Sequence, residues 1–146
     1  MIWSWPVRAA LSSGIILSTT KIGTMPKQGD ILLIPIPFSD LSSQKRRPVI
    51  VISNDQYNGK TGDVVVVAMT SNPEVTDYSF SITSSDLVKG ALNRPGKVRV
   101  DKIYTLSQAI IVKTFGRVDA PTLDRVRRKL EDLAAKRPHS DVKDGK

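Results

Sequence analysis

Residues 45–54 read KRRPVIVISN and join a run of cations directly to an apolar segment. Val49 to Ile52 carry no polar side chain, which is typical of a strand buried on both faces of a sheet. Pro48 removes one backbone donor at the start of this strand, where the loss is tolerated. Arg47 is therefore expected at the rim of a rigid element, beside an exposed loop, where a cation can hold a phosphate.

From Gly29 onward the chain alternates short apolar runs with turn signals, a pattern that predicts strands. The predicted strands are Asp30–Pro37, Pro48–Ser53, Val64–Met69, Ser79–Thr83, Lys97–Ile103 and Ala109–Val118. Ser39–Arg46 is a predicted polar loop, and Asn54–Asp63 is a predicted turn-rich connection. Ser84–Asp86 is expected to cap a single helical turn that Gly90 stops.

A helix is predicted over Pro121–Lys136, where Asp119 can serve as the N-cap and proline occupies the first turn. The apolar residues that recur there at helical spacing are Leu123, Val126, Leu130 and Leu133. Several short strands followed by one terminal helix predict a mainly β (α+β) fold. We expect a small, strongly curved β-barrel whose core the helix closes.

The composition favours a polyanionic partner. The 146 residues carry 22 Lys and Arg against 14 Asp and Glu, a formal net charge of +8. Nucleic acid, an anionic membrane or an acidic protein would suit that charge, and so would a surface that is basic only for solubility. The chain has no cysteine, which excludes disulfides and thiolate metal sites. Its one histidine, His139, lies in a polar tail, so neither histidine catalysis nor a histidine metal cluster is expected.

The ends of the chain differ from its centre. Residues 1–24 contain both tryptophans and a weak apolar run that is too short to span a bilayer. We interpret them as a disordered leader or an upstream extension, with a targeting segment as the alternative. Residues 25–136 form the predicted domain, and residues 137–146 are predicted to be a disordered tail.

Arg99 and Asp101 are candidates for chemistry. In an alternating strand they share one face, opposite Val98 and Val100. Taken alone, this pair favours an ordinary surface ion pair. A carboxylate beside a guanidinium can also serve as a base next to a phosphate clamp, which suits attack by an RNA 2′-hydroxyl on its neighbouring phosphate.

Thr70 and Ser71 place two hydroxyl groups where a buried strand is predicted to end. The simplest interpretation is that they begin the turn before Pro73. If they lie beside Arg47, they can donate hydrogen bonds to the same phosphate.

Four segments, taken in order and spacing, resemble the MazF/PemK family of toxin endoribonucleases from bacterial toxin–antitoxin pairs. They are Gly29–Ile31, Arg47–Ile52, Ala68–Ser71, and Val98–Asp101 followed by Thr105–Ser107. The resemblance covers about Pro26 to Ala135. Each motif is common by itself, and the ordered set is what carries the likeness.

The resemblance implies an SH3-like or CcdB-like barrel that forms a homodimer. It also implies cleavage of single-stranded RNA at short sequence motifs, with no metal and no cofactor, to leave 2′,3′-cyclic phosphate and 5′-hydroxyl ends. Arg47 and Thr70 match the catalytic arginine and threonine of MazF-like members. Arg99 and Asp101 match the pair assigned as acid and base in Kid/PemK-like members.

The ordinary pKa of arginine lies far above neutral pH, so the side chain rarely gives up its proton. We therefore expect Arg47 and Arg99 to act as transition-state clamps and Asp101 to act as the base. Some PemK-like members carry a histidine in the first loop, where this chain has none; Gln44 or Lys45 could take its place.

Substrate reading is expected from the two loops of residues 39–46 and 54–62. Their cations can contact phosphates, and aromatic side chains at their edges can stack on unpaired bases. The predicted RNA-binding residues are Phe38, Gln44, Lys45, Arg46, Tyr57, Lys60 and Ser71. Phe38 is equally consistent with a place in the barrel core.

The expected partners are single-stranded mRNA, a second copy of the chain, and a cognate acidic antitoxin whose disordered tail covers the basic groove. Operator DNA is expected only indirectly, through the antitoxin, and the expected location is cytoplasmic. Two alternatives stay open: a CcdB-like toxin that poisons gyrase, and a barrel that binds nucleic acid without cleaving it. A metal-dependent nuclease is disfavoured because the sequence lacks clustered carboxylates.

Overall fold

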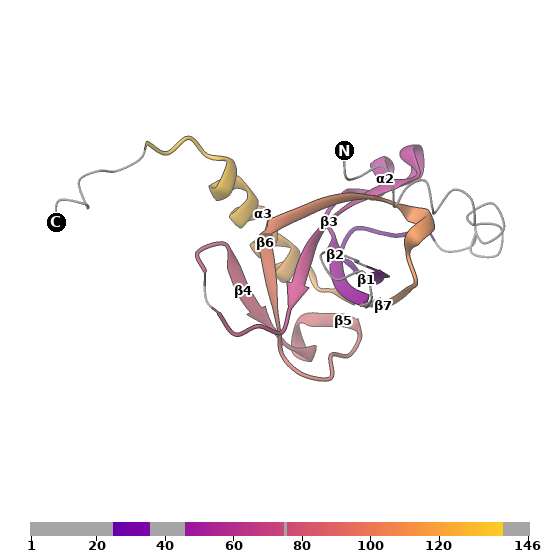
Figure 1. Ribbon diagram of the computed structural model, residues 1–146, viewed down its shortest axis with the longest axis horizontal. Coiled ribbons are helices and arrows are strands. Elements are labelled where there is room, and N and C mark those ends of the chain that lie inside the picture. Colours follow the sequence, from indigo (N-terminus) through magenta and orange to yellow (C-terminus); the bar gives the residue numbers. More distant parts are fainter. Residues whose placement is uncertain (1–24, 36–45, 75, 139–146) are drawn as a thin grey trace.

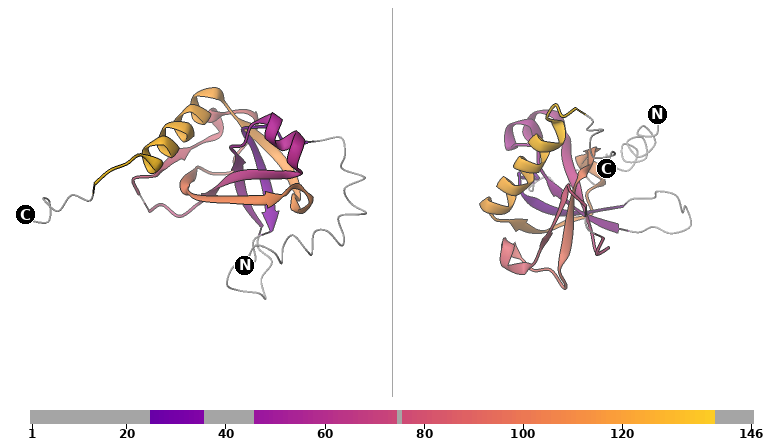
Figure 2. Two further views of the ribbon diagram at one scale, coloured as in Figure 1. Left: turned by 90° about the horizontal axis from the view of Figure 1, so that it is seen from above. Right: turned by 90° about the vertical axis from the view of Figure 1, so that its left-hand side faces the viewer.

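A single antiparallel sheet of seven strands, in the order β4-β6-β3-β2-β1-β7-β5, curls upon itself, and a C-terminal helix lies along one side of it (Figures 1 and 2). The computed structural model describes residues 25–35, 46–74 and 76–138. The prediction of a mainly β fold with a terminal helix is confirmed. The leader 1–24, most of the first loop with Phe38, Gln44 and Lys45, and residues 139–146 with His139 lie outside the described residues.

The strands agree broadly with the predicted segments. Their bounds are β1 Asp30–Pro35, β2 Arg46–Val51, β3 Asp63–Thr70, β4 Ser79–Ile82, β5 Leu87–Gly90, β6 Gly96–Ser107 and β7 Lys113–Val118. The helices are α2 Asp55–Thr61 and α3 Ala120–Ala134, with short 3₁₀ turns η1 Ser84–Asp86 and η2 Gln108–Ile110. Asp119 caps α3 as predicted, because its side chain accepts a hydrogen bond from the Thr122 backbone N–H at 2.9 Å.

Both faces of the central strands are buried, which explains the uninterrupted apolar run in β2. Ile50 belongs to a core cluster that includes Val126 of α3. Its neighbours Val49 and Val51 belong to a second cluster on the other side of the sheet. All three β2 residues are completely buried. Burial on both faces requires the sheet to be covered twice, by α3 on one side and by its own curled continuation on the other.

A wide bulge in β6 sets the curvature beside the predicted site. Val67 of β3 pairs with Ile103, whereas the next residue, Ala68, pairs with Arg99. The three residues of β6 between those partners, Val100 to Lys102, therefore have no pairing partner in β3. Bulges of this kind bend a strand and redirect its side chains, and they recur next to active sites.

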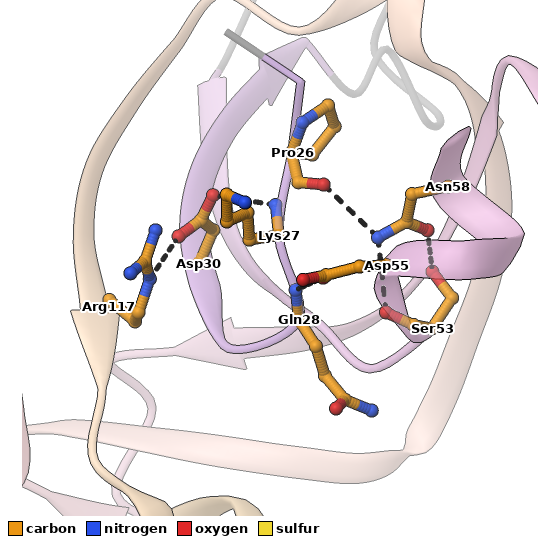
Figure 3. Close-up of polar contacts among 8 residues, drawn as sticks. All are labelled: Pro26, Lys27, Gln28, Asp30, Ser53, Asp55, Asn58 and Arg117. Atoms are coloured by element: carbon orange, nitrogen blue, oxygen red, sulfur yellow. Dashed lines mark hydrogen bonds and ion pairs between the residues drawn. The ribbon is translucent and has the colours of Figure 1, made fainter.

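The prediction of a turn-rich connection over residues 54–63 was wrong, because this segment contains the helix α2. Asn54 caps this helix by accepting from the Tyr57 backbone N–H, and Gly62 ends it in the left-handed conformation. The buried Asn58 side chain donates to the backbone carbonyls of Pro26 and Ser53 (Figure 3). The sequence of α2 has little intrinsic helix propensity, since it contains Gly59. The hydrogen bonds of Asn58 compensate for this.

A buried carboxylate holds the start of the domain against β7. Asp30 is 4% exposed and accepts from Arg117 Nε at 2.8 Å. Its other oxygen accepts from the Lys27 backbone N–H at 2.9 Å (Figure 3). Because both oxygens are satisfied, the charge is tolerated in the sheet.

Two further predictions need correction. The helical turn expected to run from Ser84 through Lys89 is only the 3₁₀ turn η1, since Leu87 to Gly90 pair with β7 as strand β5. The last predicted strand begins at Lys113 instead of Ala109, because the preceding residues form η2. Residues 87–90 form a strand because they pair with β7. In both places the tertiary context overrode the local signal.

Replacement of the helix cap should weaken the fold in a pH-dependent way. Hydrogen bonds from Thr122, side chain first and backbone second, lower the pKa of Asp119. Asp119→Ala should therefore cost about 1 kcal/mol at neutral pH. A lowered folded-state pKa means that this contribution is complete above the ordinary aspartate range and disappears as pH falls through the lowered value.

Urea unfolding of both proteins across a pH series measures the effect. Asp124→Ala is the matched control, since that residue forms only exposed pairs along α3 and should cost about 0.5 kcal/mol or less. A stability difference for Asp119→Ala that does not shrink in acid would contradict the capping role.

Two glycines with positive φ separate backbone strain from steric overlap. Gly62 has φ 74° and no atom within 4 Å of an added Cβ, so Gly62→Ala should cost about 1–2 kcal/mol. Gly90 has φ 79°, and an added Cβ would lie 2.2 Å from the Phe115 carbonyl oxygen. Gly90→Ala should therefore cost about 1–3 kcal/mol more. Equal losses in thermal or urea unfolding would show that β5 does not hold Gly90 against β7.

Candidate functional site

An open cavity of about 680 Å³ lies at one end of the sheet, between strands β1 to β3 and the connection from β5 to β6. Its lining residues are Leu33, Arg46, Arg47, Pro48, Met69, Thr70, Ser71, residues 91–96, Lys113 and Phe115. The cavity therefore brings together four of the predicted site residues: Arg46, Arg47, Thr70 and Ser71. Volumes of about 300–1,000 Å³ are usual for ligand sites.

The strand register explains why Arg47 and Thr70 meet. Val49 of β2 lies opposite Ala68 of β3. Continuing that antiparallel register by two residues in each strand sets Arg47 beside Thr70, at the end of the ladder. Side chains of opposite residues share one face of a sheet and are separated by about 5 Å at Cβ. A guanidinium and a hydroxyl group are thus placed on one face of the sheet, and both residues border the cavity.

Arg99 lies one row away on the same face of the sheet, because Thr70 pairs with Lys97 and Arg99 is two residues further along β6. Arg99 lies opposite Ala68, one strand beyond Val49. Its Nε donates to Asp101 Oδ1 at 2.9 Å and its Nη2 donates to Oδ2 at 2.8 Å. The alternation predicted for this strand is confirmed, since Val98 and Val100 are fully buried on the other face. The ion pair is 22% and 32% exposed, so solvent and a ligand can reach it.

Pairing shifts the pKa of each residue so that its ionised form is favoured. The hydrogen bonds from Arg99 lower the pKa of Asp101, against a smaller opposing effect of burial. The same hydrogen bonds raise the pKa of Arg99 above its ordinary value. Arg99 therefore stays a cation throughout the accessible pH range and cannot serve as a proton donor. Asp101 is a carboxylate at neutral pH.

The electrostatic character of the cavity is uniformly positive. The part of its lining that the structure describes contains four cations, Arg46, Arg47, Arg94 and Lys113, and no acidic residue. Among the described residues, none of these four cations forms an ion pair within the protein. Leu33, Pro48, Met69, Leu92 and Phe115 supply apolar surface in the same cavity. Cations around an apolar floor suit a ligand that combines anionic groups with flat, apolar rings.

The structure separates two of the remaining predicted residues, Tyr57 and Lys60, from this cavity. Tyr57 and Lys60 lie on α2, which precedes the first residue of β3, whereas Thr70 is its last residue. Eight residues of β3 cover roughly 24 Å at about 3.4 Å per residue. Phe38, Gln44 and Lys45 lie outside the described residues.

Sequence analysis missed Asn93, Arg94, Lys113 and Phe115, which also line the cavity. Arg94 lies in a turn-like run, ALNRPG, that offers a cation in a loop but no sign of where that loop packs. Lys113 begins a strand whose start was assigned to an earlier residue. Only the pairing of β5 and β1 with β7 brings these residues to the mouth of the cavity.

The described residues contain neither a metal-binding cluster nor a membrane-spanning helix. No three His, Cys, Asp or Glu side chains there come close enough to hold a metal ion. Within the same residues, no helix is both long enough and apolar enough to cross a bilayer.

Comparison with known proteins identifies relatives of this arrangement. Residues 27–134 match a family model described as PemK-like, MazF-like toxin of type II toxin–antitoxin system. An endoribonuclease in complex with its cognate antitoxin, from a mycobacterial species, has 23% sequence identity and a TM-score of 0.63. That likeness covers 77% of this chain and 99% of the other. No curated protein sequence matches this chain.

A second solved structure agrees. MazE–MazF from Deinococcus radiodurans has 24% identity and a TM-score of 0.61, and the match covers 75% of this chain and 96% of the other. At these identities the two structures establish a shared fold.

Removal of the Arg99 side chain should return the pKa of Asp101 toward its ordinary value. Arg99→Gln takes away the two hydrogen bonds that lower it. Carboxyl-carbon NMR titration of the wild type and the variant measures the change, and Asp101 should be protonated at higher pH in the variant. Arg127→Gln, on the exposed side of α3, is the control and should leave the titration unchanged. An unaltered Asp101 titration in Arg99→Gln would contradict the pairing.

Proposed function

The chain belongs to the PemK-like, MazF-like toxin family of type II toxin–antitoxin systems, and from this premise we propose that it is a sequence-specific endoribonuclease. Its proposed substrate is single-stranded mRNA in the cytoplasm. The proposed reaction needs no metal and no cofactor. It leaves 2′,3′-cyclic phosphate and 5′-hydroxyl ends.

One observation carries the proposal: Arg47 and Thr70 border a cationic cavity, and Arg99, paired with Asp101, lies in the neighbouring row on the same face of the sheet. Cleavage by a 2′-hydroxyl needs a base for that hydroxyl and cations for the charge that builds on the phosphate oxygens. The four residues supply one carboxylate and two guanidinium groups. The threonine hydroxyl adds a hydrogen-bond donor.

In the proposed step the 2′-oxygen attacks the neighbouring phosphorus while Asp101 takes the hydroxyl proton. The new O2′–P bond closes the cyclic phosphate as the P–O5′ bond breaks, and water protonates the departing 5′-oxygen. Arg47 and Arg99 bind the phosphate oxygens, and Thr70 donates a hydrogen bond to one of them. Stabilisation of that charge is usually the largest contribution to such a reaction.

The Arg99–Asp101 pair must open for this chemistry. With both carboxylate oxygens held by Arg99, Asp101 has a lowered pKa and is a weak base. An RNA phosphate is itself a bidentate acceptor for a guanidinium group. When the phosphate takes the place of the carboxylate on Arg99, the pKa of Asp101 rises again and its oxygens become free to accept a proton. Substrate binding thereby switches on the base.

Type II toxins act beside an antitoxin, and the cationic cavity suggests how. We propose that a cognate acidic antitoxin places a negatively charged segment across the cavity and blocks access to RNA. Operator DNA would be contacted indirectly, through the antitoxin. We propose a homodimer as the working form, in line with the family resemblance.

Incubation of the full-length protein with a long single-stranded RNA in EDTA, followed by mapping of the fragment ends, tests the activity. Discrete cuts with 5′-hydroxyl ends are expected. Asp101→Asn should lower the cleavage rate by about 100-fold or more, because the amide cannot accept the proton. Its affinity for RNA should stay near that of the wild type. Asp124→Asn, on the exposed side of α3, is the matched control and should cleave normally.

The other outcomes are informative. Cleavage that survives in Asp101→Asn would remove that residue from the base role. RNA binding by a folded wild-type protein that makes no cuts would support a barrel that only binds nucleic acid, and a gyrase-poisoning assay would then follow. Cuts that vanish in EDTA and return with a divalent ion would indicate a metal-dependent nuclease.

A further inference from the structure

The connection from β5 to β6, residues 91–95, forms a wall of the cavity together with Gly96, the first residue of β6. It carries Arg94, a cation with no role in the chemistry described above. A loop residue positions a ligand more precisely when its backbone is held in place. The contacts at the start, middle and end of this connection show that it is held.

The start of the connection is locked to β7. Gly90 pairs with Gly116, and the backbones approach so closely that a Cβ on Gly90 would lie 2.2 Å from the Phe115 carbonyl oxygen. A Cβ on Gly116 would lie 2.9 Å from the Lys89 carbonyl oxygen. Two glycines facing each other thus permit a strand contact that no larger residue would allow.

The middle and the end of the connection are also anchored. The Ser84 hydroxyl accepts a hydrogen bond from the Leu92 backbone N–H at 2.8 Å and donates one to the Leu92 carbonyl at 3.1 Å. At the other end, Gly96 pairs with Ile82 of β4. The segment between these anchors therefore presents Arg94 from a nearly fixed backbone.

Arg94 and Lys113 complete a ring of positive charge around the cavity. Both are exposed, and neither forms an ion pair among the described residues. Arg46 and Arg47 come from β2 on the opposite wall. An RNA strand running between the walls would present one phosphate to Arg47. The adjacent phosphates of the RNA backbone would then lie near Arg94 and Lys113, on the far wall. Cations on both walls fit a continuous polyanion better than a single phosphate.

We propose that Arg94 and Lys113 bind the RNA phosphates that flank the cleaved bond, with Ser84 as the positioning residue for Arg94. This inference rests on the proposed ribonuclease function. It assigns the far wall of the cavity to holding the substrate strand in register with Arg47, Thr70 and Asp101.

The test measures RNA affinity separately from cleavage. The probe is a short RNA that spans a mapped cut and carries a 2′-deoxy nucleotide at the attacking position, so that it binds without reacting. Arg94→Ala and Lys113→Ala should each weaken binding by about tenfold. Each should also reduce the slope of log affinity against log salt by about 0.7. Lys136→Ala removes the same charge after the end of α3 and should change neither quantity.

A double-mutant cycle tests the positioning role. Ser84→Ala should weaken RNA binding in the wild type and have almost no further effect in an Arg94→Ala protein. A residue that matters only for stability would give the same loss in both backgrounds. Urea unfolding of every variant identifies losses that come from misfolding. Because Lys113 does not depend on Ser84, the Lys113→Ala result stands even if Ser84→Ala is unstable.

The outcomes separate the two proposals. A wild-type protein that cuts RNA, together with Arg94→Ala and Lys113→Ala variants of unchanged affinity and salt slope, would overturn this inference and leave the ribonuclease intact. A wild-type protein that neither binds nor cuts RNA would overturn both. If the two variants bind RNA normally but bind poly-L-glutamate more weakly, the far wall serves an acidic protein segment instead, and the inference is wrong.

Discussion

The wide bulge in β6 is the constraint on which the site depends. Three residues, Val100 to Lys102, have no partner in β3. The Val100 backbone N–H instead donates to the Tyr78 carbonyl oxygen at 2.9 Å, next to the start of β4. One half of β6 can thus pair with β4 and β3 together, while the other half continues along β3 alone. The change of direction takes Asp101 out of the regular ladder and leaves it free to meet Arg99.

The ion pair that results has two consequences that follow from a single geometry. Two parallel hydrogen bonds orient the Arg99 guanidinium and keep it ready for an oxyanion. The same bonds lower the pKa of Asp101, so the carboxylate is held in a poorly basic state while no anion is bound. In the proposed reaction the substrate phosphate replaces the carboxylate as the partner of Arg99, which links binding to activation.

Burial on both faces of the sheet explains why the functional residues collect at its end. The centre of each strand is committed to one of two core clusters, through residues such as Val49 and Ile50. Arg47 and Thr70 lie where the ladder between β2 and β3 ends, beyond these buried segments. Glycines then allow β5 to approach β7 closely enough to carry the second wall, with Arg94, over the same end.

The sequence alone determined the features that depend on local period. Alternation placed Arg99 and Asp101 on one face, the apolar run over 49–52 predicted a strand with both faces buried, and helical spacing with Asp119 as the cap predicted α3. Tertiary structure alone decided the rest. Helix α2 exists because buried Asn58 reaches Pro26 and Ser53, and Arg94 and Lys113 meet Arg47 because β5 and β1 both pair with β7. The physical reason is that a strand's side-chain alternation is set by its own backbone. The partner of a loop or an edge strand is set by contacts between residues far apart in the chain, and a local pattern does not record those contacts.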